Sequence, residues 1–420
     1  MKKIIIFVLQ IPLILFFYTA NASVSVLKNY ADIAEAVYED SLYTAKILKE
    51  AIDEFTREPS EYNLNRAKEA WFAARVPYQQ SEVYRFGNAL VDDWEGKVNA
   101  WPLDEGLIDY VDKTSYGSQS DENGNYNSNV VANKNIKING KNVSTSSITK
   151  DLISEKLHEA GGVESNVATG YHAIEFLLWG QDLNGTKNGA GMRRATDFSK
   201  VNCTNGNCNR RIQYLKVATD LLIDDLQEMV SKWRDNGAAR KIIIDGGINK
   251  GLTAIITGLG SLSYGELAGE RIQLGLMLHD PEEEHDCFSD NTHNSHYYDQ
   301  IGMMNVYTGK YVGVNGKIIS GPSIGDLIKR KNAGLHNEML GKLSATLLSM
   351  NNMKKTAEAG KSYDQMLAVG DKHGNEIIQD VVDHLKDQTV SIEKIVATLD
   401  LNKIEFEGSD SLDNPKKVFE

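Results

Sequence analysis

The residues best suited to chemistry lie in the run Gly170-Tyr171-His172-Ala173-Ile174-Glu175. Positions three apart share one face of a helix, so His172 and Glu175 are expected to point into one space. An imidazole nitrogen with a carboxylate oxygen suits zinc, iron and similar metals. Gly170 allows another backbone or a ligand to approach closely. The alternative is a core histidine satisfied by its own glutamate one turn away.

The same His-x-x-Glu spacing also occurs at His279–Glu282 and at His373–Glu376. Those two pairs lie at a helix end and at a polar junction, without apolar neighbours. Only His172 lies inside an apolar helix with a glycine two residues before it, so we place the site there.

Other charged residues could line a pocket. The sequence indicates two helix faces that each carry an acidic residue beside an arginine. Buried charges need partners, so a polar pocket is expected if these faces point inward. A solvated helix face is the alternative. A third run, from His285 to His293, is dense in possible ligands but equally suits a loop whose Asp, Ser and Asn cap a helix or turn. We prefer the loop for most of that run. The candidate pocket residues are Arg85, Glu266, Glu270, Arg271, His285 and His293.

Long helices must position these residues, because several segments repeat apolar side chains every 3.6 residues. Four helices are predicted before residue 180, the second of them interrupted near Pro77. A second series begins with Ile212 to Trp233. Further helical patterns lie near residues 249–279, 323–350 and 375–399.

An internal repeat organises these helices. Alternating apolar residues before Asn139-Gly140 predict a small hairpin, and the same pattern precedes Asn315-Gly316, 176 residues later. The predicted fold is therefore all-α, with duplicated four-helix bundles that each carry a polar insertion with an Asn-Gly hairpin. The predicted bundles span residues 23–180 and 210–420, joined by a linker at 181–209.

The N-terminus predicts export. Lys2 and Lys3 precede an uncharged run from Ile4 to Phe17, and Ala20-Asn21-Ala22 supplies small residues for cleavage after Ala22. Residues 1–22 are thus a predicted signal peptide. An uncleaved anchor is the alternative, but the run is shorter than the roughly 20 residues that a spanning helix needs. The segment lacks a lipoprotein cysteine and no later stretch resembles a membrane span, so we expect a periplasmic or otherwise exported protein.

Charge and cysteines agree with that compartment. The chain has 58 acidic and 45 basic residues, a net charge of −13, which becomes −15 when Lys2 and Lys3 are removed. Such a negative field disfavours nucleic acid and anionic lipid and favours cations, although solubility alone also explains the charge.

Cys203 and Cys208 are expected to form a disulfide across a short loop. A metal clip is the alternative, but neighbouring ligands are missing. Cys287 is left as a thiol.

The motif Gly-x-His-x-x-Glu on a helix resembles the imelysin family, which includes insulin-cleaving-metallopeptidase-like and iron-regulated proteins. Supporting motifs stand at residues 75–85, 101–106, 266–272 and 286–293, and they look most like the iron-regulated branch. The resemblance implies two helical bundles with a site between them, an extracytoplasmic location and a link to iron uptake. It implies metal ligands at His172 and Glu175, completed by Glu82 and Asp104. Glu266 and Glu270 match less specifically.

Three functions follow from these observations. The first is a non-catalytic protein that binds a divalent or trivalent metal ion, with iron expected and zinc the alternative. The ion would be bound free or as a chelate, and an iron-transport system would be the partner. The second is a zinc-dependent metallopeptidase of the imelysin type. Zinc hydrolases show three protein ligands and a separate base, and the usual His-Glu-x-x-His and His-x-x-Glu-His helices are missing here. The third is a heme or protein-partner module.

Overall fold

The computed structural model describes residues 11–117 and 119–419, with side chains from residue 22 onward. The all-helical prediction is confirmed: helices make up most of the described chain, and the strands there form two short hairpins. The predicted signal peptide spans residues 1–22, of which residues 1–10 lie outside the described part. Its cleavage stays a prediction.

The elements follow one another in a long helical series. The α-helices are α1 (Ile11–Arg57), α2 (Glu61–Gln79), α3 (Ala89–Asn99), α4 (Lys150–Leu152), α5 (Gly170–Trp179), α6 (Cys208–Trp233), α7 (Ala238–Ile244), α8 (Ile248–Ser261), α9 (Leu274–Leu278), α10 (Thr292–Thr308), α11 (Ile324–Lys331), α12 (Ala333–Glu358), α13 (Tyr363–Leu367), α14 (Lys372–Thr398) and α15 (Asp410–Asp413). The strands are β1 (Asn135–Ile138), β2 (Lys141–Ser144), β3 (Lys310–Val312) and β4 (Ile318–Ser320). Short 3-10 turns and two π-helical segments, η3 (Ile153–Leu157) and η6 (Leu262–Gln273), complete the series.

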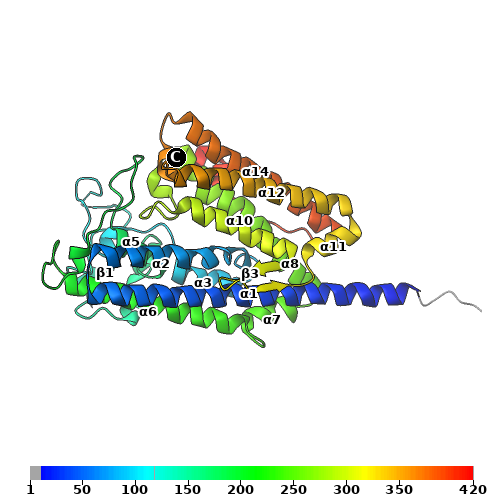
Figure 1. The fold of residues 1–420 in the computed structure, drawn as a ribbon, viewed down its shortest axis with the longest axis horizontal. Helices are drawn as coiled ribbons and strands as arrows, with labels where there is room; N and C mark the ends of the chain where they lie inside the picture. The colour runs from blue at the N-terminus through cyan, green and yellow to red at the C-terminus, as the bar shows by residue number, and fades with distance from the viewer. Residues whose placement is uncertain (1–10, 118, 420) are drawn as a thin grey trace, which may run out of the picture.

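One layer of the molecule is built on α1. This helix packs along α2 and α6, and α5 packs on α2 and α6 (Figure 1). Aromatic side chains hold the layer together, because the Tyr38 ring lies 5.8 Å from Trp94 and 6.4 Å from Trp233, which belong to α3 and α6. The helix α6, predicted to open the second bundle, thus packs against α1. The division into domains stays a prediction.

A second layer contains α12 and α14, which lie side by side at the top of Figure 1, with α10 between them and the α1 layer. Inside this layer two buried amides meet, because the side chains of Gln300 and Gln388 hydrogen bond at 2.8 Å. The helix α10 also packs on α2 and so joins the layers. The close approach requires Gly302, because a Cβ there would overlap the backbone of Gln80.

Both predicted hairpins form. Strands β1 and β2 pair antiparallel around Asn139-Gly140, and both turn residues have positive φ, 49° and 75°. Strands β3 and β4 also pair antiparallel, but residues 313–317 form their loop. The second Asn-Gly is therefore not a two-residue turn. After each hairpin a hydroxyl side chain, Thr149 or Ser323, caps the next helix. Duplication of whole bundles stays a prediction.

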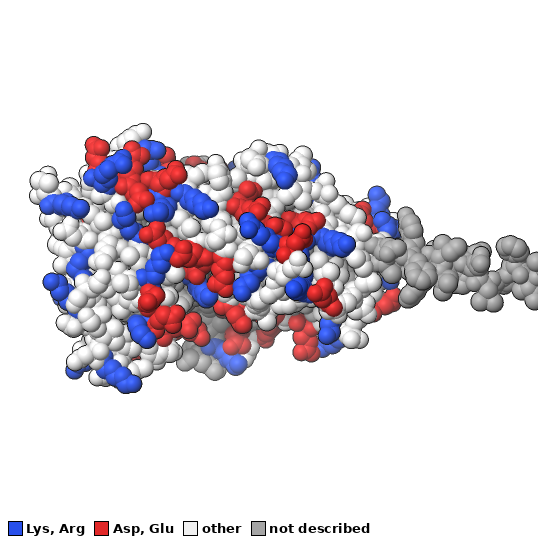
Figure 2. Space-filling model, turned by 90° about the horizontal axis from the view of Figure 1, so that it is seen from below, with Lys and Arg blue, Asp and Glu red and all other residues white. Residues whose placement is uncertain are grey.

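The disulfide between Cys203 and Cys208 is present, and Cys287 is a buried thiol, so both cysteine predictions are confirmed. Within the described part of the chain, no single helix has the length and apolar composition to cross a membrane; one bent pair, Cys208–Ile244 and Ile248–Leu278, meets both criteria together at an angle of 92°. The face in Figure 2 carries acidic and basic side chains interspersed.

Candidate metal centre

The helix α5 places the predicted pair in the interior. All ten residues of α5 are buried, and His172 and Glu175 are both 0% exposed. The Nδ1 atom of His172 lies 3.1 Å from Oε2 of Glu175, as the three-residue spacing predicts. Gly170 begins the helix with φ +77°, and a Cβ there would overlap the backbone of Val98. The close approach expected at Gly170 is therefore made by another segment of backbone, at Val98.

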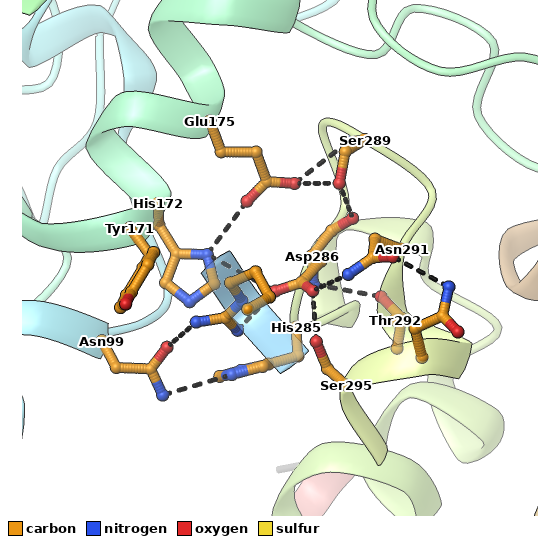
Figure 3. Close-up of polar contacts among 12 residues, drawn as sticks. Asn99, Tyr171, His172, Glu175, His285, Asp286, Ser289, Asn291, Thr292 and Ser295 are labelled. Carbon is orange, nitrogen blue, oxygen red and sulfur yellow. Dashed lines mark hydrogen bonds and ion pairs between the residues drawn. The ribbon is translucent and has the colours of Figure 1, made fainter. Parts of the chain in front are cut away.

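A loop from the second half of the chain completes the centre. His285 and Asp286 precede α10 and face α5 (Figure 3). One possible ligand atom from each of His172, His285 and Asp286 lies within 4.8 Å of the others. The two imidazole rings are 4.8 Å apart, and His172 Nδ1 lies 3.8 Å from Asp286 Oδ1. Asp286 was not among the predicted ligands, although it belongs to the ligand-dense run that we assigned mainly to a loop.

Several side chains hold Asp286 in place (Figure 3). A terminal nitrogen of Arg75 donates to Asp286 Oδ1 at 2.7 Å, and Asn291 Nδ2 donates to Oδ2 at 2.8 Å. The hydroxyl of Ser295 donates to the same Oδ2. Asn99 connects the two sides, because it accepts from Arg75 at 2.5 Å and lies 3.4 Å from His285 Nε2. The carboxylate is therefore fixed in position and partly neutralised.

Electrostatics prepare the centre for a cation. Burial, followed by the charge of Arg75, lowers the pKa of His172 to about 3, and burial with nearby Arg271 lowers the pKa of His285. Burial opposes ionisation of Asp286, but Arg75 and other neighbours outweigh it and hold its pKa low. Burial and the adjacent Asp286 raise the pKa of Glu175. At neutral pH the centre thus presents two neutral imidazoles and the carboxylate of Asp286, and the raised pKa of Glu175 favours its protonated form.

Two ring nitrogens in the centre are unsatisfied. His172 Nε2 and His285 Nδ1 are buried and form no hydrogen bond to the described residues. A buried polar atom without a partner costs roughly 1–3 kcal/mol, so such atoms call for a role. Neutral imidazole nitrogens and a carboxylate oxygen are ligands that zinc and iron accept, and three protein ligands leave a coordination position open. The residues therefore fit a metal ion.

Glu82 lies in a second buried cluster and makes no ion pair with the centre among the described residues. Its Oε2 is 2.6 Å from Arg271, and Arg271 also contacts Glu266 at 2.6 Å. Arg85 lies 3.1 Å from Glu266, and Asp299 lies 3.4 Å from Arg271. The sequence left open whether the acid–arginine faces form a polar pocket or a solvated helix face, and this buried packing agrees with the pocket.

The π-helical segment η6 explains this cluster. Glu266 and Arg271 are five residues apart, a spacing that points in different directions on an α-helix but coincides on a π-helix. Arg271 Nε donates to Glu266 Oε1 at 2.7 Å. Burial opposes ionisation of Glu266, but Arg271 and Arg85 outweigh it and lower its pKa to about 2. Glu270, which precedes Arg271, is exposed.

Asp104 lies at a different place, beside an open pocket of about 400 Å³. It accepts hydrogen bonds from Ser165, at 2.7 Å, and from Asn123. Trp101 lines the pocket, and its ring lies 5.3 Å from that of His172, so the pocket adjoins the centre. Burial, together with the neighbouring Glu282, raises the pKa of Glu105 in this pocket to about 8.

The remaining candidate, His293, is buried near the centre but outside it. Its Nε2 lies 3.0 Å from Asn294 Nδ2, on the first turn of α10. The structure therefore brings together His172, Glu175, His285 and Asp286, and it places Glu82, Asp104 and His293 elsewhere. The long-range pairing with residues 285–286 has no local signal in the sequence beyond the density of ligand types there.

Comparison with known proteins agrees with this architecture. The sequence profile of the imelysin family matches residues 34–392. Iron-regulated protein A of Synechococcus elongatus is 23% identical over 275 residues, which are 63% of this chain and 58% of that protein, so the match spans little more than half of the relative.

Two solved structures share the fold. One is named for an iron-regulated protein A precursor from Parabacteroides distasonis; it has a TM-score of 0.64 and 18% identity, with 90% of this chain and 95% of that chain covered. The other is an imelysin-like protein from Psychrobacter arcticum, with a TM-score of 0.59 and 15% identity, and 91% and 97% covered.

Proposed function

The chain belongs to the imelysin family, and we propose that it is an exported, non-catalytic protein that binds a metal ion at His172, His285 and Asp286 and serves iron uptake. The observation that carries this proposal is the meeting of two neutral, partly unsatisfied imidazoles with one carboxylate in the buried interior. Such a set attracts a cation and offers lone pairs to it without prior loss of protons.

Iron is the proposed metal because the similar proteins carry iron regulation in their names. Zinc suits the same nitrogen and oxygen ligands and is the alternative. Glu175 would add a fourth ligand in its ionised form. The pocket beside Trp101, with Asp104 and Glu105 in its wall, is the proposed route by which the ion, free or released from a chelate, reaches the centre.

The second candidate function, a zinc metallopeptidase, is favoured by the three-ligand set. A peptidase also needs a base and space for a peptide bond at the metal. Here Glu175 accepts two hydrogen bonds from Ser289, at 3.0 Å and 2.6 Å, and burial raises its pKa, which favours the protonated form over the base. The three ligands are nearly or completely buried, at 0–2% exposure. Binding therefore agrees better with the geometry than cleavage does.

The test is metal analysis of protein purified from its own periplasm, followed by calorimetric titration of iron and zinc into wild type and His285→Ala. We expect about one metal ion per chain and much weaker binding by the variant. His293→Ala is the matched control, because His293 is buried nearby but outside the centre, and it should bind as wild type does. Equal binding by wild type and His285→Ala would refute the centre, and metal-dependent peptide cleavage lost in His285→Ala would establish the peptidase instead.

A further inference from the structure

A second pocket, of about 210 Å³, lies between the two layers on another side of Arg75. Residues of α2 form one wall, and the loop and first turns of α10, from Asn291 to Tyr298, form the other. A water molecule occupies about 30 Å³ of liquid, so the pocket has room for about seven waters or a small organic molecule.

The floor of this pocket contains polar groups without partners. Gln79 is 0% exposed, and neither its amide oxygen nor its amide nitrogen forms a hydrogen bond to the described residues. Arg75 is 1% exposed, and its Nε atom also forms no hydrogen bond to the described residues. The next residue, Gln80, shows how such an amide is normally satisfied: it donates to Val76 O at 3.1 Å and accepts from Asn305 at 2.9 Å.

Three residues of the opposite wall already donate hydrogen bonds to other protein groups. Asn291 and Ser295 both donate to Asp286, and Asn294 donates to Asn291. Two donors at the floor of the pocket are therefore free, the N–H of Arg75 Nε and the amide nitrogen of Gln79. One acceptor is free, the amide oxygen of Gln79. A ligand that matches it needs an oxygen group with several lone pairs beside one hydrogen-bond donor.

We propose that this pocket binds a small α-hydroxycarboxylate, whose carboxylate accepts from Arg75 Nε and Gln79 Nε2 while its hydroxyl donates to Gln79 Oε1. The guanidinium and the positive N-terminal end of α10, a helix of 17 residues, favour a negative charge over a neutral amide. This assignment does not require an occupied metal centre, because Arg75 contacts Asp286 through a terminal nitrogen, and its Nε is a different atom, without a hydrogen-bond partner among the described residues.

The test is calorimetric titration of glycolate into the whole mature protein without added metal, since α-hydroxycarboxylates chelate free ions. Acetate, which lacks the hydroxyl, and glycolamide, which lacks the charge, serve as comparison probes. We expect glycolate to bind more tightly than either. Gln79→Leu should bind glycolate about tenfold more weakly, because two hydrogen bonds are lost. Its stability should equal or exceed that of wild type, since an unsatisfied buried amide is removed.

The matched control is Gln80→Leu, the same substitution one residue later and outside the pocket, which should leave glycolate affinity unchanged. A second variant, Ala73→Phe, fills the pocket from its rim while Arg75 and Gln79 are kept, and it should abolish glycolate binding. The proposal is overturned if wild type binds no glycolate at millimolar concentration, or if Gln79→Leu and Ala73→Phe bind it as wild type does.

Discussion

His172 and His285 approach each other from distant parts of the chain, and their burial determines what they can do. A buried imidazole near a fixed guanidinium stays neutral, and a neutral imidazole is the form that binds metals. Arg75 thus acts on the centre twice: it holds Asp286 ionised and helps keep His172 deprotonated. His172, His285 and Asp286 therefore need no change of protonation when a cation arrives.

The first prediction concerns His172. His172→Ala removes one of three ligands, so the affinity for iron or zinc should fall by at least about tenfold while the helical circular dichroism spectrum is retained. His279→Ala is the matched control, because His279 has the same spacing to a glutamate but hydrogen bonds to the Leu367 carbonyl at 2.6 Å. It should bind metal as wild type does. Equal affinities for wild type and His172→Ala would remove this residue from the centre.

The second prediction concerns Glu105, whose folded pKa is about 8. In the unfolded chain the pKa of a glutamate is about 4.3, so the unfolded state ionises at a lower pH than the folded state. The wild type therefore loses stability as the pH rises from about 4 to about 8. Glu105→Gln removes this loss. The stability of the variant relative to wild type should therefore rise from pH 5 to pH 8, by an amount on the order of a few kcal/mol.

Urea unfolding at the two pH values measures this difference. Glu155→Gln, at an exposed position, is the control and should differ from wild type by the same amount at both pH values. A relative stability of Glu105→Gln that does not change with pH would contradict the burial of an ionisable carboxyl at this position.

Among the elements, η6 organises the second cluster and was not predictable. An apolar period of 3.6 residues predicts helix near 249–279, and helix is found there, as α8, η6 and α9. The wider turn of η6 depends on tertiary packing and on the contact of Glu266 with Arg271, which periodicity does not report. The first hairpin was predictable because Asn-Gly suits positive φ at both positions. The second has a longer loop, although its local sequence is similar.

The third prediction tests the cluster around Arg271. Arg271→Met leaves Glu82, Glu266 and Asp299 buried with less compensation, so the free energy of unfolding should fall by about 3–5 kcal/mol. Lys331→Met is the matched control, because Lys331 pairs with Asp400 at 2.9 Å on the exposed surface, and its loss should cost less than about 1 kcal/mol. Chemical denaturation of both variants measures the contrast. Similar small losses would show that the cluster is solvated rather than buried.

At the scale of the whole molecule, the centre joins parts of the chain that sequence analysis treats separately. The pair on α5 was predictable, because its geometry is local to one helix. Its partners were not, because the approach of residues 285–286 depends on how α10 packs on α2. Glu82 and Asp104 were expected beside His172 from resemblance. The packing of η6 and the hydrogen bonds of Ser165 place them in other surroundings.

The last prediction follows from this arrangement. A metal that binds the folded protein alone raises the free energy of unfolding, by about 2.7 kcal/mol at one hundred times the dissociation constant. Because its ligands come from α5 and from the segment before α10, bound metal should slow amide hydrogen exchange in both. Hydrogen exchange with mass spectrometry, with and without zinc, measures each segment. In Asp286→Asn the protection from exchange should decrease in both segments. Asp151→Asn, a control at an exposed position, should retain the protection in both. Protection confined to α5 would mean that the metal does not join the two parts of the chain, and His285 and Asp286 would then not be its ligands.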